Sequence, residues 1–249
     1  MIRPLMPWLL LLVLLLSPGL ALADGLRVAV ASNFRHPMEA MKDAFERANG
    51  HSLVLIFGST GKHYAQIRNG APFDAFFAAD AERPERLERE GLAVPGTRFT
   101  YAVGRIVLWS ADPGLVDAEG EVLASGAFRH LAIANPDLAP YGAAARDLLR
   151  KIGLWQRLQP RLVRGENIGQ TFQFVVSGNA ELGFVARSQL ESPQNAFEGS
   201  RWMPPASAYP PIEQQAVLLR DSPAGRALLD FMRGDAAAAI LRAYGYDSP

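Results

Sequence analysis

The stretch FGSTGKHYAQI, residues 57–67, contains the residue types of an anion-binding loop: two glycines, two hydroxyl side chains and a lysine follow an apolar run. A nucleotide-binding loop of the Walker type needs four residues between its first glycine and its Gly-Lys pair, and then a serine or threonine for the magnesium ion. Here only Ser59 and Thr60 separate the glycines, and His63 follows Lys62. The spacing therefore excludes a site for a nucleoside triphosphate.

Two interpretations of this stretch remain. Free backbone N–H groups at the start of a helix attract an anion, which favours a small anionic ligand beside Ser59 and Thr60. Alternatively, one of the two hydroxyls simply caps the helix, as serine and threonine do in many proteins. Further junctions of the same kind would favour the first interpretation.

Three other strand-to-helix junctions have this character: VAVASNFRHP (residues 28–37), AIANPDLAPYGAAA (132–145) and LVRGENIGQTF (162–172). Each offers backbone N–H groups, and hydrogen bonds to a charged group contribute roughly 1.5–3 kcal/mol each. Four junctions that converge on one point would bind a small anion tightly without a buried cation. The candidate side-chain donors are Ser32, Asn33, Ser59, Thr60, Tyr141 and Asn167.

The ionisable side chains give little support for an enzyme. The four histidines show none of the HxH, HxxxH or HExxH spacings of metal sites, and no G-x-S-x-G motif is present. His63 is predicted on a helix surface, and Glu166 and Asp137 are expected to face solvent. Cysteine is absent, so neither disulfides nor thiol chemistry is available.

Short apolar runs alternate with helical patterns along the chain, and this order predicts an α/β fold with parallel sheets covered by helices. A second α/β pattern follows a long β-prone run at residues 101–110, and two helices close the chain. Strands are predicted at residues 26–31, 52–57, 73–79 and 130–135, and helices at 37–50, 61–70, 83–91, 142–153, 225–234 and 236–245.

The alternation predicts two lobes. Lobe 1 is assigned residues 24–101 and 210–249, and lobe 2 residues 102–209, with crossings near residues 100–105 and 207–214 that act as hinges. Ligands of open α/β sheets bind at the carboxyl ends of the strands, so the ligand is expected in the cleft between the lobes.

The first 23 residues have the features of a secretory signal peptide: Arg3, an apolar run over residues 8–16 and a small-residue cleavage site ending at Ala23. The chain has 25 basic and 25 acidic residues, and removal of Arg3 with the signal peptide leaves 24 basic residues, so the net charge of the mature chain is about −1. This balance argues against nucleic acid or an anionic membrane as partner. The signal peptide, in turn, predicts that the protein is exported.

The junctions identify a resemblance. The sequence is similar to the periplasmic molybdate-binding proteins of ABC transporters over essentially the whole mature chain, and NGAPFDAFFAAD (residues 69–80) is its most distinctive part. The resemblance implies a type II periplasmic-binding fold that holds the tetrahedral oxyanion molybdate or tungstate in its cleft, without a cofactor and without direct ligands to the metal. It also implies a monomer in the periplasm that delivers the oxyanion to an inner-membrane ABC permease.

Carried over residue by residue, the resemblance also implies a binding site. Some family members have a tyrosine where this chain has Ala186, which implies that this contact is absent here and that Tyr141 or Asn33 compensates. The implied ligand-binding residues are Ser32 and Asn33 at the first junction, Ser59 and Thr60 at the second, Tyr141 at the third, and Ile168, through its backbone N–H, at the fourth.

Three other functions stay open. A fully deprotonated sulfate suits a ring of donors as well as molybdate does, and only the size of the cavity separates the two. A ferric site is disfavoured, because hard iron prefers anionic oxygen ligands and only Tyr141 lies in a predicted junction. The last alternative is an exported adaptor with no ligand of its own.

Overall fold

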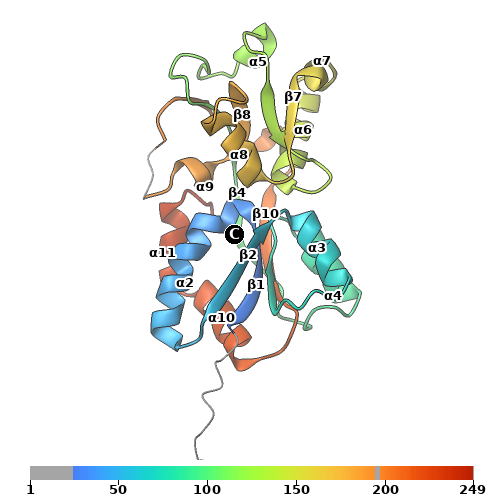
Figure 1. The fold of residues 1–249 in the computed structure, drawn as a ribbon, viewed down its shortest axis with the longest axis vertical. Coiled ribbons are helices and arrows are strands. Elements are labelled where there is room, and N and C mark those ends of the chain that lie inside the picture. Colours follow the sequence, from blue (N-terminus) through green and yellow to red (C-terminus); the bar gives the residue numbers. More distant parts are fainter. Residues whose placement is uncertain (1–24, 194–196, 249) are drawn as a thin grey trace, which may run out of the picture.

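The computed structural model describes residues 25–193 and 197–248, so the predicted signal peptide lies outside the described residues. The chain forms two lobes, each built on a five-stranded sheet that helices cover (Figure 1). The two-lobed α/β fold expected from the sequence is confirmed. Within the described residues, no helix is both long and apolar enough to cross a membrane.

The first lobe takes its elements from both ends of the chain. Its strands are β1 (Leu26–Ala31), β2 (Leu53–Gly58), β3 (Ala75–Phe77), β4 (Phe99–Gly104) and β10 (Ile212–Leu218), in the order β2-β1-β3-β10-β4. Its helices are α2 (Arg35–Asn49), α3 (Thr60–Arg68), α4 (Glu82–Arg89), α10 (Pro223–Arg233) and α11 (Asp235–Ala243), and the 3-10 turn η2 (Ser32–Phe34) joins β1 to α2.

The second lobe takes its elements from the middle of the chain. Its strands are β5 (Ile106–Ser110), β6 (Leu131–Ala134), β7 (Leu162–Gly165), β8 (Leu182–Ala186) and β9 (Ser200–Trp202), in the order β7-β6-β8-β5-β9. Its helices are α5 (Val122–Ser125), α6 (Pro140–Lys151), α7 (Trp155–Leu158), α8 (Ile168–Val176) and α9 (Arg187–Leu190), with the 3-10 turns η3 (Gln159–Arg161) and η4 (Ala206–Ala208).

Both sheets are mixed, whereas the sequence pattern predicts parallel sheets. In the first lobe β1 runs parallel to β2 and β3, but β10 is antiparallel to β3 and β4. In the second lobe β6 runs parallel to β7 and β8, and β5 is antiparallel to β8 and β9. The crossings explain the difference for the first sheet: β4 carries the chain out of the lobe and β10 brings it back, so the two strands run in opposite directions.

The chain crosses between the sheets twice. The long β-prone run of residues 101–110 divides at Arg105, because β4 pairs with β10 as far as Gly104 and β5 pairs with β8 from Ile106 onward. Residues 102–104 thus belong to the sheet of the first lobe, although the sequence analysis placed them in lobe 2. The return crossing runs between the end of β9 and the start of β10.

The hydrophobic pattern explains why the helices form and where they pack. In α2, Met38, Met41 and Phe45 recur at helical spacing and are completely buried. The helix ends at Gly50, whose φ of 69° is a left-handed conformation that glycine adopts without a steric penalty. This packing fixes the η2 turn that precedes α2.

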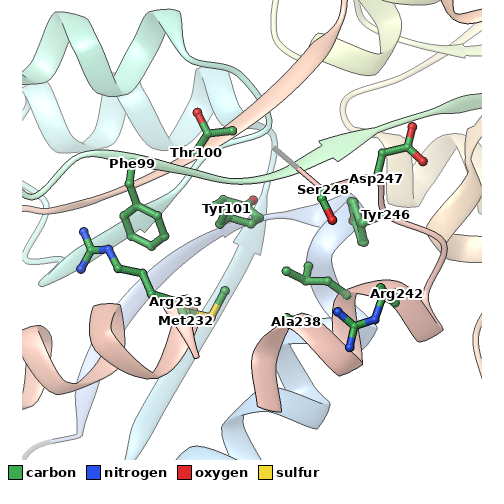
Figure 2. A pocket seen from close by; sticks show the side chains of 11 residues that line it. Phe99, Thr100, Tyr101, Met232, Arg233, Ala238, Arg242, Tyr246, Asp247 and Ser248 are labelled. Atoms are coloured by element: carbon green, nitrogen blue, oxygen red, sulfur yellow. The ribbon is translucent and has the colours of Figure 1, made fainter. Parts of the chain in front are cut away.

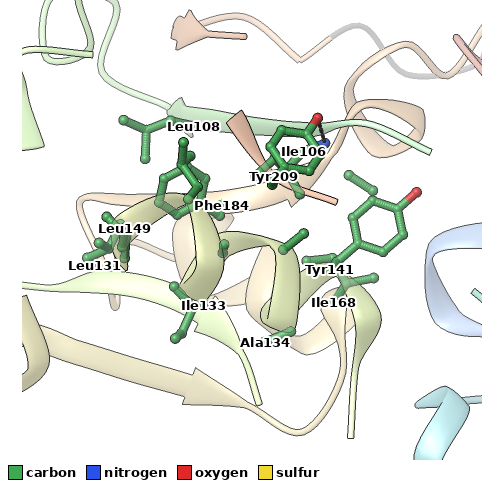
Figure 3. Packing of buried hydrophobic residues seen from close by; sticks show 14 of the residues in the cluster. Ile106, Leu108, Leu131, Ile133, Ala134, Tyr141, Leu149, Ile168, Phe184 and Tyr209 are labelled. Carbon is green, nitrogen blue, oxygen red and sulfur yellow. Dashed lines mark hydrogen bonds between the residues drawn. The ribbon is translucent and has the colours of Figure 1, made fainter. Parts of the chain in front are cut away.

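The core of the second lobe positions part of the cleft. Apolar side chains of β5, β6 and β8, among them Leu108, Ile133 and Phe184, pack into one cluster (Figure 3). Tyr141 and Ile168, two of the predicted site residues, belong to the same cluster. Their positions are therefore set by the packing of a core and not by a surface loop.

Candidate anion-binding site

Four chain junctions meet between the lobes. In the first lobe β1 leads into η2 and β2 into α3, and in the second lobe β6 leads towards α6 and β7 towards α8. Because β1 and β2 are parallel neighbours, as are β6 and β7, the two junctions of each lobe lie at the same edge of its sheet. All six residues predicted to bind the ligand line one cavity here: Ser32, Asn33, Ser59, Thr60, Tyr141 and Ile168, with Ala31, Gly58, Ala79, Ala139 and Pro140.

The cavity is small. Its volume is about 10 Å³, which is room for the centre of one small group. Asn167, another candidate donor, does not line it, because its side chain accepts a hydrogen bond from the backbone N–H of Gln170 and caps α8. The cavity therefore suits a compact ligand.

Three helices begin at the cavity. The first N–H groups of an α-helix have no partner within the helix. Thr60 and Ile168 are the first residues of α3 and α8, and Tyr141 follows Pro140 at the start of α6. In the part of the chain that the structure describes, none of these three backbone N–H groups donates a hydrogen bond. They are available to an anion, which the positive end of each helix dipole favours.

The three hydroxyl side chains of the cavity are also set up as donors. Ser32 Oγ accepts a hydrogen bond from the N–H of Gly169 at 3.3 Å. Ser59 Oγ accepts from the N–H of Lys62 at 3.3 Å, and Thr60 Oγ1 accepts from the N–H of Ala79 at 3.0 Å. Since a backbone N–H already occupies each oxygen as acceptor, each hydroxyl hydrogen is left to donate.

The lining carries neither a carboxylate nor a basic side chain. As expected, Glu166 is largely exposed, and its carboxylate lies 2.6 Å from the ammonium group of Lys62 at the edge of the cleft. Asp137 is exposed as well. Among the described residues, no group of three His, Asp or Glu side chains is placed to hold a metal ion. The cavity thus offers neutral donors and no counter-charge.

Two predicted residues meet the cavity with their backbone, because their side chains bond elsewhere. The Asn33 amide nitrogen donates to Gln214 Oε1 at 2.8 Å and to Tyr246 Oη at 2.9 Å, so both of its N–H bonds are used. The Tyr141 hydroxyl accepts from Gln214 Nε2 at 3.1 Å. Both side chains therefore belong to a buried hydrogen-bond network beside the crossings.

The tyrosines of this network stay protonated at neutral pH. Burial raises the pKa of Tyr141 and of Tyr101 well above the ordinary value, and it raises the pKa of Tyr246 to about 12. The network is consequently uncharged and brings no negative charge close to an anion in the cavity.

His63 differs from the prediction. The sequence places it on a helix surface, but only 2% of its surface is exposed. Its Nε2 lies 3.2 Å from the carbonyl oxygen of Val30, and its Nδ1 lies 3.1 Å from Gln66 Oε1. Burial lowers its pKa, against these two hydrogen bonds, which act to raise it. His63 is the fourth residue of α3 and lies on the side of the helix that faces the sheet, so its imidazole packs behind the binding loop.

The lobes are closed over the cavity, and several hydrogen bonds join them. The N–H of Gly61 in α3 donates to the carbonyl oxygen of Leu138 at 2.8 Å. Arg83 Nη2 donates to the carbonyl oxygen of Asp137 at 3.0 Å, and Ser188 Oγ donates to the carbonyl oxygen of Asn33 at 3.0 Å. These bonds join α3, α4 and α9 to segments of the opposite lobe and hold the two lobes together beside the cavity.

The sequence reasoning missed Gln214 and Tyr246. Both lie far along the chain from Asn33, and β10 and the C-terminal segment bring them to the crossings. The rings of Tyr101 and Tyr246 also line a separate pocket of about 270 Å³ between β4 and α11, on the other side of the network (Figure 2). Ala186, at the end of β8, is buried.

Two α/β lobes that close over a donor-lined cavity define a solute-binding protein. The sequence profile of the family described as bacterial extracellular solute-binding protein matches residues 26–247, and the chain belongs to this family. The expectation that the protein is not an enzyme agrees with this membership.

Within this family, the chain is similar to molybdate-binding proteins. It is 51% identical over 242 residues to the molybdate-binding protein ModA of Azotobacter vinelandii, covering 94% of this chain and 96% of the relative. It is 46% identical over 239 residues to ModA of Rhodobacter capsulatus, covering 94% and 93%. The solved structure of the periplasmic molybdate-binding protein of Azotobacter vinelandii superposes with a TM-score of 0.86 at 45% identity, covering 90% of this chain and 99% of that structure.

Proposed function

We propose that this protein binds molybdate, and also tungstate, in the periplasm and delivers it to an ABC importer in the inner membrane. The oxyanion occupies the cavity between the lobes. Its oxygen atoms accept hydrogen bonds from the hydroxyls of Ser32, Ser59 and Thr60 and from backbone N–H groups, which include those of Asn33, Thr60, Tyr141 and Ile168.

The observation that carries the proposal is the set of donors. Each of the three hydroxyls has its oxygen occupied by a backbone N–H, and three helix starts present free N–H groups. Such a cavity offers donors to several oxygen atoms, and its lining has no carboxylate or imidazole to accept a proton of the ligand. It therefore suits an anion that carries no proton at neutral pH.

This chemistry separates the candidate anions. Phosphate keeps at least one proton at neutral pH, and the lining has no carboxylate or imidazole to accept a hydrogen bond from it. Molybdate, tungstate and sulfate carry none. Between these, the similarity to two molybdate-binding proteins at 51% and 46% identity supports molybdate. Sulfate remains the alternative. It differs from molybdate in size, because molybdenum–oxygen bonds are longer than sulfur–oxygen bonds.

The transport role follows from closure. In the proposed cycle the open protein captures the oxyanion, the lobes close about the two crossings, and the closed form docks on the permease as a monomer. The proposed export through a signal peptide cleaved near Ala23 fits the word periplasmic in the name of the solved relative. No nucleic acid takes part in this cycle.

Calorimetric titration of the mature protein tests the function. We expect submicromolar affinity for molybdate and tungstate, and no heat with sulfate or phosphate in the same buffer. A preference for sulfate would keep the site but change the ligand. No heat with any of the four anions would overturn the proposal in favour of an adaptor.

A further inference from the structure

Gln214 lies at the centre of the buried network. It belongs to β10, the strand that carries the chain back into the first lobe, and none of its surface is exposed. Its Oε1 accepts hydrogen bonds from Asn33 Nδ2 at 2.8 Å and from Tyr101 Oη at 3.1 Å. Its Nε2 donates to Tyr141 Oη at 3.1 Å. One side-chain amide therefore contacts three residues.

These contacts reach both lobes. Asn33 lies in η2, which follows β1 in the first lobe, and Tyr141 is the second residue of α6 in the second. Both residues line the cavity, and each has its side chain bound to Gln214. The amide oxygen of Gln214 thus contacts a cavity-lining residue of the first lobe, and its amide nitrogen contacts one of the second lobe.

The local backbone is shaped for this arrangement. In the pairing of β10 with β4, Gln214 lies opposite Ala102 and Gln215 opposite Thr100, so Tyr101 is an extra residue. Such a β-bulge turns side chains away from the regular alternation of a strand, and bulges are frequent next to binding sites. Here it allows the Tyr101 hydroxyl and the Gln214 amide to meet at the same point.

Packing leaves little freedom at this point. A Cβ atom at Gly104 would lie 2.1 Å from Tyr141 Oη and 2.7 Å from Gln214 Nε2. The hydroxyl of the second lobe therefore rests directly on the crossing strand of the first. A shift of either partner changes the spacing between the lobes.

We propose that Gln214 is a positioning residue that sets the spacing between the two walls of the cavity and thereby the size of the oxyanion accepted. The inference rests on the proposed function. Gln214 does not line the cavity; it acts through the side chains of Asn33 and Tyr141, whose backbone N–H groups contact the ligand.

The neighbouring Gln215 offers a matched control. It is also a glutamine of β10 and is 7% exposed, and its side chain bonds to Arg98 Nη1 at 2.8 Å and Thr100 Oγ1 at 3.0 Å, away from the cavity. Gln215→Met makes the same change of side chain as Gln214→Met and removes two partly buried side-chain hydrogen bonds from the same strand. A merely structural role would give both variants the same properties.

The test measures the affinities for molybdate and for sulfate by calorimetry. It compares four proteins, each the whole mature chain: wild type, Gln214→Met, Gln215→Met and Tyr141→Phe. We expect Gln214→Met to weaken molybdate binding about 10- to 100-fold and to narrow its preference over sulfate. We expect Gln215→Met to keep the wild-type preference. Tyr141→Phe removes the same cross-lobe bond while it retains the backbone N–H, so it should weaken molybdate binding in the same direction.

The double variant Gln214→Met, Tyr141→Phe completes the cycle. Both substitutions remove the same bond, from Gln214 Nε2 to Tyr141 Oη. The fold-loss of molybdate affinity in the double variant should therefore be smaller, by at least about twofold, than the product of the fold-losses in the two single variants. Wild-type affinity and preference in folded Gln214→Met would overturn the inference, as would equal effects of Gln214→Met and Gln215→Met. If Gln214→Met does not fold, unchanged binding by Tyr141→Phe overturns it. A wild type that binds sulfate instead of molybdate would overturn the proposed function alone, since the variants can then be compared on sulfate.

Discussion

Thr60 illustrates how the fold gives a side chain one role out of two. A threonine hydroxyl can donate or accept a hydrogen bond. Here the N–H of Ala79, which follows β3, donates to Thr60 Oγ1 at 3.0 Å, and the residue is 1% exposed. The segment that follows β3 therefore uses one lone pair of the hydroxyl oxygen, and the hydroxyl hydrogen is left to donate to an oxygen atom of the ligand.

Removal of this hydroxyl tests its role directly. We expect Thr60→Val, which keeps the shape of the side chain, to weaken molybdate binding by roughly 1.5–3 kcal/mol, the contribution of a hydrogen bond to a charged group. Thr60→Ser keeps the hydroxyl and should retain most of the affinity. Calorimetric titration measures both, and equal affinities of the two variants would exclude Thr60 Oγ1 as a ligand contact.

His63 gives the protein a stability that depends on pH. Burial lowers the pKa of the folded imidazole below its usual value of 6.5, so the unfolded chain binds a proton that the folded chain does not. The free energy of unfolding should therefore fall as the pH drops below about 6.5, by up to about 1.4 kcal/mol per pH unit, until the folded imidazole is protonated as well.

The measurement is urea unfolding of wild type and His63→Gln between pH 7.5 and pH 5.5. We expect the free energy of unfolding to fall less steeply with acid in the variant, although the variant is less stable at pH 7.5. Identical slopes would mean that His63 is not the group responsible.

At the residue scale, the sequence singled out six residues that line one cavity, but not the side chains that hold two of them in place. The six residues lie at strand-to-helix junctions that carry hydroxyls, glycines and prolines, and these are local signals. Gln214 and Tyr246 contact Asn33 across 181 and 213 residues of sequence. Nothing near either residue in the chain signals this contact, because it arises only when β10 pairs with β3 and β4 and the C-terminal segment pairs with β4.

At the scale of elements, the start of α3 is a point where the backbones of the two lobes lie close together. A Cβ atom at Gly61 would lie 3.0 Å from both the Cα and the carbonyl oxygen of Leu138. The same glycine donates the cross-lobe hydrogen bond to that carbonyl. The sequence places Gly61 in the candidate anion-binding loop and at the start of a predicted helix, and the structure shows that it also allows two backbones to meet.

Gly61→Ala should act in opposite directions on stability and affinity. Alanine favours a helix over glycine by up to about 1 kcal/mol, so α3 itself should not be weakened. The added methyl group, however, should hold the lobes apart and weaken molybdate binding about 10-fold or more. Thermal unfolding without ligand and calorimetry with ligand separate the two effects.

Ala65→Gly is the control for this change, because Ala65 is exposed on α3 and its substitution alters helix propensity without contact to the second lobe. We expect it to lower stability and to leave the affinity unchanged. An unaltered affinity of Gly61→Ala would show that closure tolerates the methyl group.

Glu181 fixes the segment that precedes β6. Burial acts to raise its pKa, but hydrogen bonds from Arg129 Nε at 2.8 Å and from the N–H of His130 at 2.9 Å outweigh it, and the pKa falls to about 2. A carboxylate with a lowered folded pKa stabilises the fold above its unfolded pKa of 4.5, and this contribution is lost as the pH falls towards 2.

We expect Glu181→Gln to lower the free energy of unfolding by about 1–2 kcal/mol at pH 7, a value reduced for its contact with solvent. At pH 3 the difference from wild type should be smaller, because the unfolded glutamate is then protonated. Urea unfolding at the two pH values measures this, and a difference that is the same at both would show that the charge of Glu181 is unimportant.

Patterns in the sequence predicted most elements but not how they pair. Residues 26–31 form β1 as predicted, because the apolar run is short and bounded on both sides. The sequence pattern predicts one long β-prone run over residues 101–110 although it contains Gly104, yet the run serves two sheets, since the chain passes from one lobe to the other at Arg105. Local sequence does not indicate the direction of a strand either, because the direction depends on which lobe the chain comes from.

At the scale of the whole molecule, closure brings charges together at the edge of the cleft. Lys62 in α3 and Glu166 in the β7–α8 junction belong to different lobes, and their side chains are 48% and 59% exposed. Attraction between exposed charges is weak and is screened by salt. The pair forms only when the lobes meet, so its attraction opposes opening.

The alternative role for Lys62 is to attract the anion to the cleft, and the rates of binding distinguish the two roles. If the pair holds the lobes together, Lys62→Gln and Glu166→Gln should both speed the release of molybdate by about two- to fivefold at low salt, and high salt should remove the difference. If Lys62 attracts the anion, Lys62→Gln should slow association, whereas Glu166→Gln should speed it, because that change removes a negative charge. Stopped-flow measurement of both rate constants at two salt concentrations decides between them. We expect the first pattern, because the ammonium group lies 2.6 Å from the carboxylate and its field outside the cleft is largely neutralised. Release rates equal to wild type in both variants would show that the closed form is held by the ligand and the buried hydrogen bonds alone.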